Sequence, residues 1–118
     1  MTGQESELQI QQARDVRVIN INGGLIDRLG VEKVSDQISD NLAKTQAPKV
    51  VICFDKINEV SSAILGAVLK IDKQVRAGNG HLRLSGMQPN VKEVFRITRL
   101  DTILDIHVNS TEAVEHFE

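Results

Sequence analysis

Residues 49–85, KVVICFDKINEVSSAILGAVLKIDKQVRAGNGHLRLS, decide the fold of this chain. The near-continuous apolar run at 49–54 is typical of a strand that is covered on both faces. From Ser61 or Ser62 to residue 77 the apolar residues recur at helical spacing, and Gly78-Asn79-Gly80 is a helix-ending sequence. Apolar and polar side chains alternate again at residues 81–85, which indicates another strand. This strand–helix–strand order predicts parallel strands joined by a helical crossover.

The segments before residue 49 add a hairpin and a helix. Residues 7–13 alternate apolar and polar side chains, and residues 16–21 are rich in β-branched residues, so we expect two antiparallel strands. Gly23-Gly24 should end the second strand. Residues 29–45 then carry apolar side chains at helical spacing, and Pro48 follows them.

The segments after residue 85 predict a helix, a strand and a last helix. Pro89 is a favoured first residue of a helix, whose core-facing residues we expect to be Val91, Val94, Phe95 and Ile97. Residues 102–107 predict a short strand, and residues 109–112 should cap a helix that ends at Phe117. The predicted fold is therefore a single α/β domain over residues 1–118. Its order is β-β-α-β-α-β-α-β-α, with a mixed, mostly parallel sheet and helices packed against it.

Composition narrows the classes of function. The formal net charge is −2 and aromatic residues make up 3% of the chain, so neither a basic patch nor base-stacking rings for nucleic acid are expected. Cys53 is the single cysteine and lies in the apolar run, which predicts a buried thiol and no disulfide. The sequence predicts no metal and no cofactor. It has no signal peptide and no stretch of ~20 apolar residues, so we expect a cytoplasmic protein that does not insert into membranes.

Several spaced features resemble the bacterial STAS domain, the family of sulfate transporters and anti-sigma factor antagonists. The family has an apolar strand, a loop ending in Asp-Ser-Ser/Thr-Gly, a Leu-Gly helix, a glycine turn, a strand, a Pro-started helix and a "TGLD" segment. The stand-alone length resembles the antagonist branch. The matching segments are Val60-Ser61-Ser62-Ala63, Leu65-Gly66, Gly78-Asn79-Gly80, Leu82-Arg83-Leu84, Pro89 and Thr98-Arg99-Leu100-Asp101, with Ile21-Asn22-Gly23-Gly24-Leu25 at the place of the family's "GELD" turn.

The resemblance implies a regulator that binds proteins. Such an antagonist binds an anti-sigma factor that is also a serine kinase, in a partner-switching circuit that regulates transcription. The kinase phosphorylates the first serine of the pair, here Ser61 with Ser62 as its neighbour, and a phosphatase reverses the modification. A plain helix N-cap is the alternative role for Ser61. The implied partner-binding residues are Ile26, Asp27, Glu59, Val60, Ser61, Ser62 and Ile64.

The pattern departs from the family at its acidic positions. Val60 stands where the family has an aspartate before the serine, and Ile26 stands at the aspartate of the "GELD" turn, one residue before Asp27. If Ile26 and Val60 are exposed, they form an apolar patch that suggests a partner bound by hydrophobic contact. Core filling is the alternative for Ile26, Val60 and Ile64.

The sequence also bears on other classes of function. The chain has no nucleophile elbow, phosphate-binding loop or zinc spacing, so we do not expect an enzyme. A second hypothesis is a scaffold module that is never phosphorylated, in a stressosome-like particle or a lipid-transport ABC complex. A third is a nucleotide-binding STAS module. The oligomeric state stays open, with a weak homodimer among the alternatives.

Overall fold

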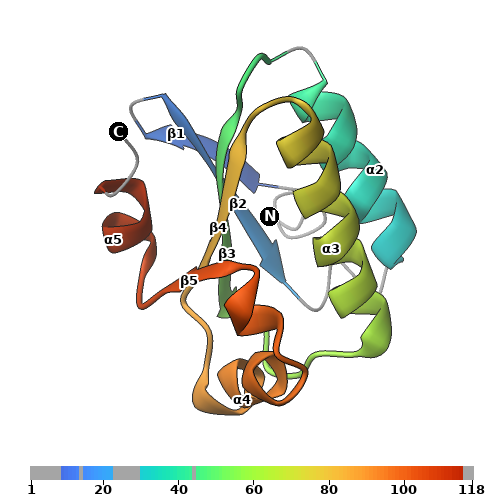
Figure 1. Cartoon of the computed structure of the whole chain (residues 1–118), viewed down its shortest axis with the longest axis vertical. Coiled ribbons are helices and arrows are strands. Elements are labelled where there is room, and N and C mark those ends of the chain that lie inside the picture. Colours follow the sequence, from blue (N-terminus) through green and yellow to red (C-terminus); the bar gives the residue numbers. More distant parts are fainter. Residues whose placement is uncertain (1–8, 14, 23–29, 44, 116–118) are drawn as a thin grey trace, which may run out of the picture.

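The fold follows the predicted order of elements (Figure 1). The structure, a computed structural model, describes residues 9–13, 15–22, 30–43 and 45–115. The predicted features at Gly23-Gly24, Ile26, Asp27 and Phe117 lie outside these residues. The strands are β1 Gln9–Ala13, β2 Val16–Asn22, β3 Lys49–Lys56, β4 His81–Ser85 and β5 Asp105–His107; the helices are α2 Val31–Leu42, α3 Ser62–Ala77, α4 Pro89–Ile97 and α5 Ser110–Glu115, with a 3-10 turn, η2, at Leu100–Thr102.

The strands form one mixed sheet in the order β1-β2-β3-β4-β5. The β1–β2 pair is antiparallel, and the β2–β3, β3–β4 and β4–β5 pairs are parallel. Strand β3 lies in the middle, where Ile52 pairs with Ile19 of β2 on one side and Leu84 of β4 on the other. The prediction of a mixed, mostly parallel sheet is confirmed.

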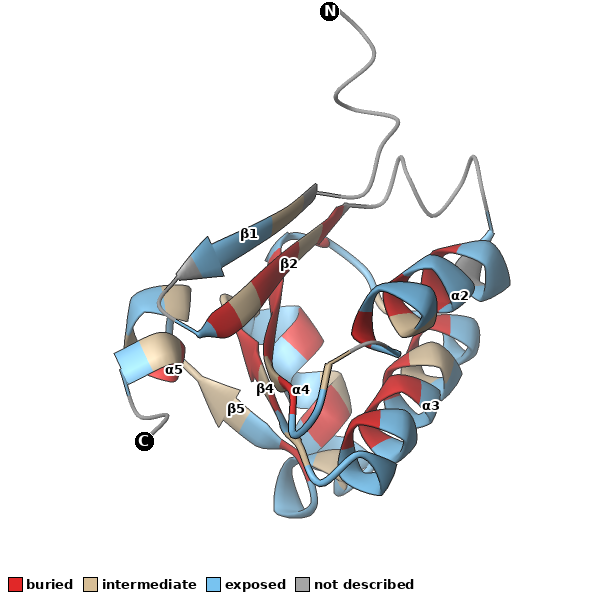
Figure 2. Ribbon diagram, turned by 90° about the horizontal axis from the view of Figure 1, so that it is seen from above, coloured by how far each residue is buried: buried red, intermediate tan, exposed pale blue. Residues whose placement is uncertain are grey.

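Helices cover both faces of the sheet (Figure 2). Side chains alternate along β3, so Ile52 and Phe54 join α2, α3 and α4 in the larger core, whereas Val51 and Cys53 meet α5 on the other face. Phe95 of α4 packs edge-on against Phe54, with ring centroids 5.9 Å apart. The central strand is thus buried on both faces, as its apolar run predicted. Cys53 is buried, which confirms that prediction.

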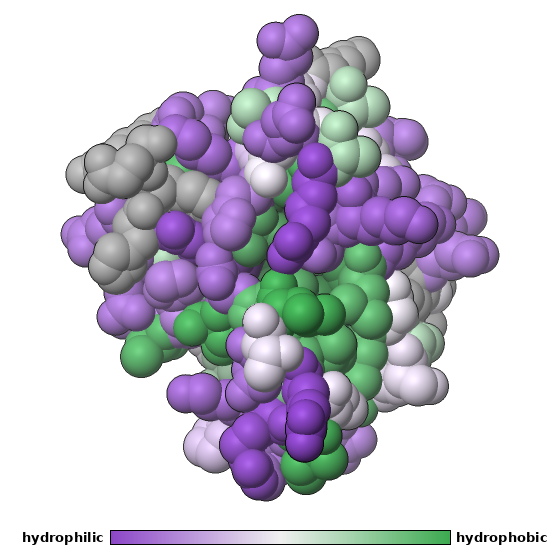
Figure 3. All heavy atoms as spheres, in the orientation of Figure 1, coloured by the Kyte–Doolittle hydropathy of each residue, from purple (hydrophilic) through white to green (hydrophobic). Residues whose placement is uncertain are grey.

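One side chain predicted to face the core is exposed instead. Ile97 of α4 is 66% exposed. Ile97 is the last residue of its helix and lies two positions beyond the buried Phe95, on the opposite side of the helix. Figure 3 shows apolar surface in the middle of the face seen in Figure 1, framed by hydrophilic side chains.

The last strand is shorter than predicted. The sequence predicts a strand over 102–107, but β5 begins at Asp105, because the chain before it forms the 3-10 turn η2 and reaches the sheet only after Ile103. The left-handed backbone of Arg99, with φ of 64°, ends α4 and turns the chain into η2. The predicted cap of α5 is confirmed, since the Glu112 N–H donates to Asn109 Oδ1 at 2.8 Å.

Candidate functional site

Ser61 is the N-cap of helix α3 and is exposed. Its backbone is extended, with φ of −92° and ψ of 167°, and its Oγ accepts a hydrogen bond from the Ile64 N–H at 3.2 Å. Ser62, the first residue of the helix, is exposed as well. The predicted start of this helix at the serine pair is confirmed. Both hydroxyl groups are therefore accessible from solvent at one end of a 16-residue helix.

The loop before Ser61 is held in place from both sides. Ile57 is 1% exposed and anchors the loop in the core. The Gln88 side-chain amide donates to Asn58 Oδ1 at 2.8 Å, and the Asn90 amide donates to the Asn58 carbonyl oxygen at 2.6 Å. These bonds tie the loop to the start of α4. The serine pair is thus presented from a fixed loop, through amide contacts that sequence reasoning missed.

The predicted docking residues separate into exposed and buried ones. Glu59, Ser61 and Ser62 are exposed, and Val60 is half-buried with its side chain packed against the core. Ile64 is 9% exposed and belongs to the core, so core filling holds for Ile64 and it cannot contribute to an exposed surface. The predicted docking surface therefore retains Glu59, Val60, Ser61 and Ser62 among the described residues, and we call these four the docking surface.

The start of α3 is electrostatically suited to an anion. The first turn of the helix contains no acidic residue. Its leading N–H groups precede the internal ladder of hydrogen bonds, and the helix dipole places partial positive charge there. Glu59 is the carboxylate nearest in sequence, two residues before Ser61, and is exposed. A phosphate group on Ser61 would meet the positive end of a long helix.

Neither His81 nor Cys53 is placed to activate Ser61. His81 begins β4, whereas Ser61 follows the end of the parallel strand β3, so these residues lie at opposite ends of the two strands. The His81 Nε2 is instead bonded to the Asp105 carboxylate. Burial raises the pKa of the Cys53 thiol, which keeps it protonated and poorly nucleophilic. No group of three or more metal-ligating side chains is found among these residues.

Comparisons with known proteins agree with the fold. The model of the STAS domain family matches residues 7–113. The chain is 31% identical over 90 residues to BtrV of Bordetella bronchiseptica, a candidate anti-sigma factor antagonist by name, and the match covers 76% of each chain. Within the described residues, no helix has the length and apolarity needed to cross a membrane.

Solved structures share the same architecture. A crystal structure of a candidate anti-sigma factor antagonist from Thermotoga maritima has a TM-score of 0.79 at 21% identity, covering 94% of both chains. The Bacillus protein SpoIIAA in its phosphorylated form has a TM-score of 0.69 at 20% identity, covering 95% of this chain and all of that one. At these identities the two likenesses concern the fold.

Proposed function

Because this chain belongs to the STAS domain family, we propose that it is an anti-sigma factor antagonist that is switched by phosphorylation of Ser61. In its unmodified form it binds an anti-sigma factor that is also a serine kinase, in the cytoplasm, and thereby releases a sigma factor. Phosphorylation of Ser61 ends this binding, and a phosphatase restores it. The chain itself acts by docking and carries out no catalysis.

One observation carries the proposal: Ser61 presents an exposed hydroxyl at the start of α3, on a loop fixed by Asn58. A kinase needs an accessible hydroxyl, and a docking partner needs a surface of constant shape. The phosphate would add ~−1.5 to −2 charge and acceptor oxygens beside free helix N–H groups. The modified chain can therefore keep its fold while its docking surface changes in charge.

The half-buried Val60 gives this surface a particular character. In the family the residue before the serine is an aspartate, so an apolar side chain here removes one negative charge from the unmodified surface. The remaining carboxylate in the docking surface is Glu59. We expect the partner to cover Val60 with an apolar side chain. A negative charge is then brought to this contact chiefly by phosphorylation.

The test incubates the chain with a cognate anti-sigma factor of the serine-kinase type and ATP, and measures the intact mass of the chain. We expect one phosphate on wild type and on Ser62→Ala, and none on Ser61→Ala. Titration calorimetry should show that the unmodified chain binds the partner and that the phosphorylated chain does not. Peptide mapping of the modified chain places the phosphate.

Two outcomes would contradict the proposal. A chain that stays unmodified after exhaustive kinase treatment would exclude the switch. If the same unmodified chain still bound its partner tightly, it would act as a constitutive module of a larger complex. If it bound no anti-sigma factor at all, the antagonist function itself would be excluded.

A further inference from the structure

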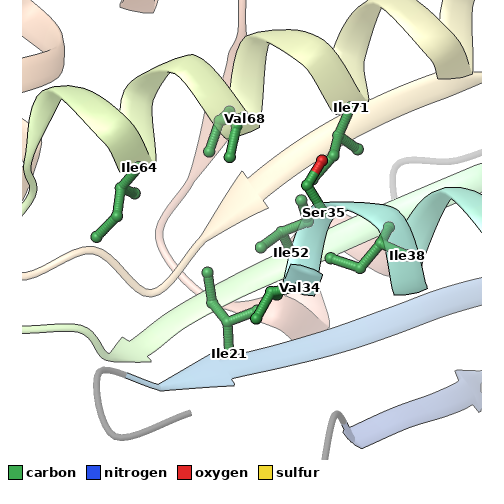
Figure 4. A pocket seen from close by; sticks show the side chains of 9 residues that line it. Ile21, Val34, Ser35, Ile38, Ile52, Ile64, Val68 and Ile71 are labelled. Carbon is green, nitrogen blue, oxygen red and sulfur yellow. The ribbon is translucent and has the colours of Figure 1, made fainter. Parts of the chain in front are cut away.

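The cavity between helices α2 and α3 is too small to bind a regulator. Its volume is ≈ 20 Å³, about the space that one water molecule needs. Figure 4 shows that aliphatic side chains surround it, among them Val34, Ile38 and Val68, with the Ser35 hydroxyl directed toward α3. This cavity therefore leaves recognition to the surface of the domain.

Arg99 has a left-handed backbone at the end of helix α4. Its φ is 64°, a region that residues with a side chain adopt only at a conformational cost. The "TGLD" segment of the family has glycine at this position, where no such cost arises. The conformation is fixed, because the Thr102 hydroxyl donates to the Arg99 carbonyl oxygen at 2.6 Å. An arginine in a position that favours glycine points to a role for its side chain outside the fold.

The Arg99 guanidinium has no partner in the part of the chain that the structure describes, and the residue is exposed. Arg96, one turn earlier, differs, because its guanidinium donates two hydrogen bonds to the Glu93 carboxylate. Arg99 therefore offers its N–H donors to a group outside the chain. A guanidinium pairs best with a carboxylate or a phosphate, through two parallel hydrogen bonds.

Exposed aliphatic residues precede and follow Arg99. Ile97, the last residue of α4, is 66% exposed, and Ile103, directly after η2, is 53% exposed. Arg76 of α3 holds this part of the chain in place, since its guanidinium donates to the Ile103 carbonyl oxygen at 2.8 Å. We call Ile97, Arg99 and Ile103 the α4 corner. Arginine is enriched at the energetically important positions of protein interfaces, and exposed apolar surface is typical of such sites.

The charges around the α4 corner favour a protein over a polyanion. Residues 93–103 contain two arginines and two carboxylates, Glu93 and Asp101, so this segment has no net charge. Binding to nucleic acid or to an anionic membrane depends on several cations acting together. A single carboxylate beside apolar side chains, as on the surface of a protein, fits the one unpaired guanidinium.

Helix α4 connects the α4 corner to the docking surface. Gln88 and Asn90, at the start of the helix, hold the loop that leads to Ser61. The helix runs from there for nine residues, about 13 Å, to Ile97. Figure 1 shows α4 and the start of α3 at the same end of the molecule. One partner can therefore contact both surfaces at once.

The docking surface is too small to form an interface alone. Its four residues are far fewer than the roughly 20–30 residues that each partner contributes to a standard interface. A protein that binds at Ser61 must also cover neighbouring surface. The α4 corner supplies exposed apolar side chains and an unpaired charge for this purpose.

We propose that the α4 corner is a second contact of the anti-sigma factor. A carboxylate of the partner pairs with Arg99, and apolar side chains of the partner cover Ile97 and Ile103. The inference rests on the proposed function, because the same partner binds at Ser61. A partner with acidic side chains on this face is attracted by Arg99 and repelled by a phosphate on Ser61.

The test is titration calorimetry of the full chain with a cognate anti-sigma factor of the serine-kinase type. Arg99→Gln removes the charge and keeps a polar side chain at the same backbone angles, so it should weaken binding about fivefold. Arg99→Glu should weaken binding further, because it repels the carboxylate. Arg99→Gly should also bind more weakly, although it relieves the backbone and raises the melting temperature. A purely structural role would not separate stability from affinity in this way.

The matched control is Arg96→Gln, which removes a cation from the same end of α4 that is already paired with Glu93. It should bind within about twofold of wild type, because exposed ion pairs contribute little. Ile103→Ser should weaken binding about threefold, because apolar surface that the partner covers is lost.

Three results would overturn the inference. If Arg99→Gln and Ile103→Ser bind as tightly as wild type does, the α4 corner is not a contact, while the proposed function stands. If Arg96→Gln loses as much affinity as Arg99→Gln, the effect comes from charge in general and not from the unpaired guanidinium. A wild-type chain that binds no such anti-sigma factor would exclude both the proposed function and this contact.

Discussion

Replacing Ser61 with alanine should lower the free energy of unfolding by about 1 kcal/mol, even where no kinase is present. The substitution removes the Oγ that accepts the Ile64 N–H. Loss of an N-cap costs about 0.5–2 kcal/mol. The bond is long, at 3.2 Å, and the Ser61 side chain is exposed, so little packing is lost with it. Both facts place the cost in the lower half of that range.

Urea unfolding followed by circular dichroism measures this loss, since the chain has no Trp or Tyr to report by fluorescence. Ser62→Ala is the matched control. Ser62 is already helical and its hydroxyl caps nothing, so we expect a change of less than about 0.3 kcal/mol. Ser61→Asp should stay within about 0.5 kcal/mol of wild type, because aspartate caps as well as serine and its charge suits the helix dipole.

Equal losses for Ser61→Ala and Ser62→Ala would refute the cap. So would a Ser61→Asp protein as unstable as Ser61→Ala. If the stabilities of the three variants follow this order, Ser61→Asp can also be used to measure how charge at residue 61 affects partner binding. Any affinity that it loses would then come from surface charge and not from a damaged helix α3.

Three further predictions concern the fold. In urea unfolding, Gly80→Ala should lower the free energy of unfolding by about 3 kcal/mol, because its methyl group would lie 2.3 Å from the Pro48 carbonyl oxygen. Gly66→Ala should instead raise the free energy of unfolding by about 1 kcal/mol, because the added methyl group has open space at this helix position. Burial raises the pKa of the Cys53 thiol above its ordinary 9.0, so the protonated thiol contributes stability below pH 9 that is lost as the pH rises further. The free energy of unfolding of wild type should therefore fall above pH 9, and that of Cys53→Ala should lack this fall. Arg99→Gly should gain about 0.5 kcal/mol, seen as a higher melting temperature, because φ is 64° there.

The sequence predicted the elements whose pattern is local. The central strand was evident because its apolar run is covered on both faces, and helix α3 was evident from its serine start and glycine end. The errors lie where one pattern fits two environments. Ile97 continues the apolar spacing of α4, but it lies at the last turn, where no other element covers it. Spacing alone does not reveal where the neighbouring elements stop.

The candidate site was predictable only in part, for a similar reason. A serine at the start of a helix is a local signal, and it correctly marked the N-cap at Ser61. The bonds that fix the loop join Asn58 to Gln88 and Asn90, about thirty residues away, and amide side chains give no pattern that predicts such pairs.

The position of Ser61 constrains how a phosphate could switch this protein. A phosphate at the N-cap meets helix N–H groups and no acidic residue in the first turn, so it should stabilise α3 and leave the fold intact. The switch must then act through charge on the docking surface, where Glu59 already carries one negative charge. Repulsion between exposed charges is screened by salt over about 10 Å at 0.1 M. The loss of partner binding on phosphorylation should therefore shrink as ionic strength rises, whereas a loss caused by refolding would not.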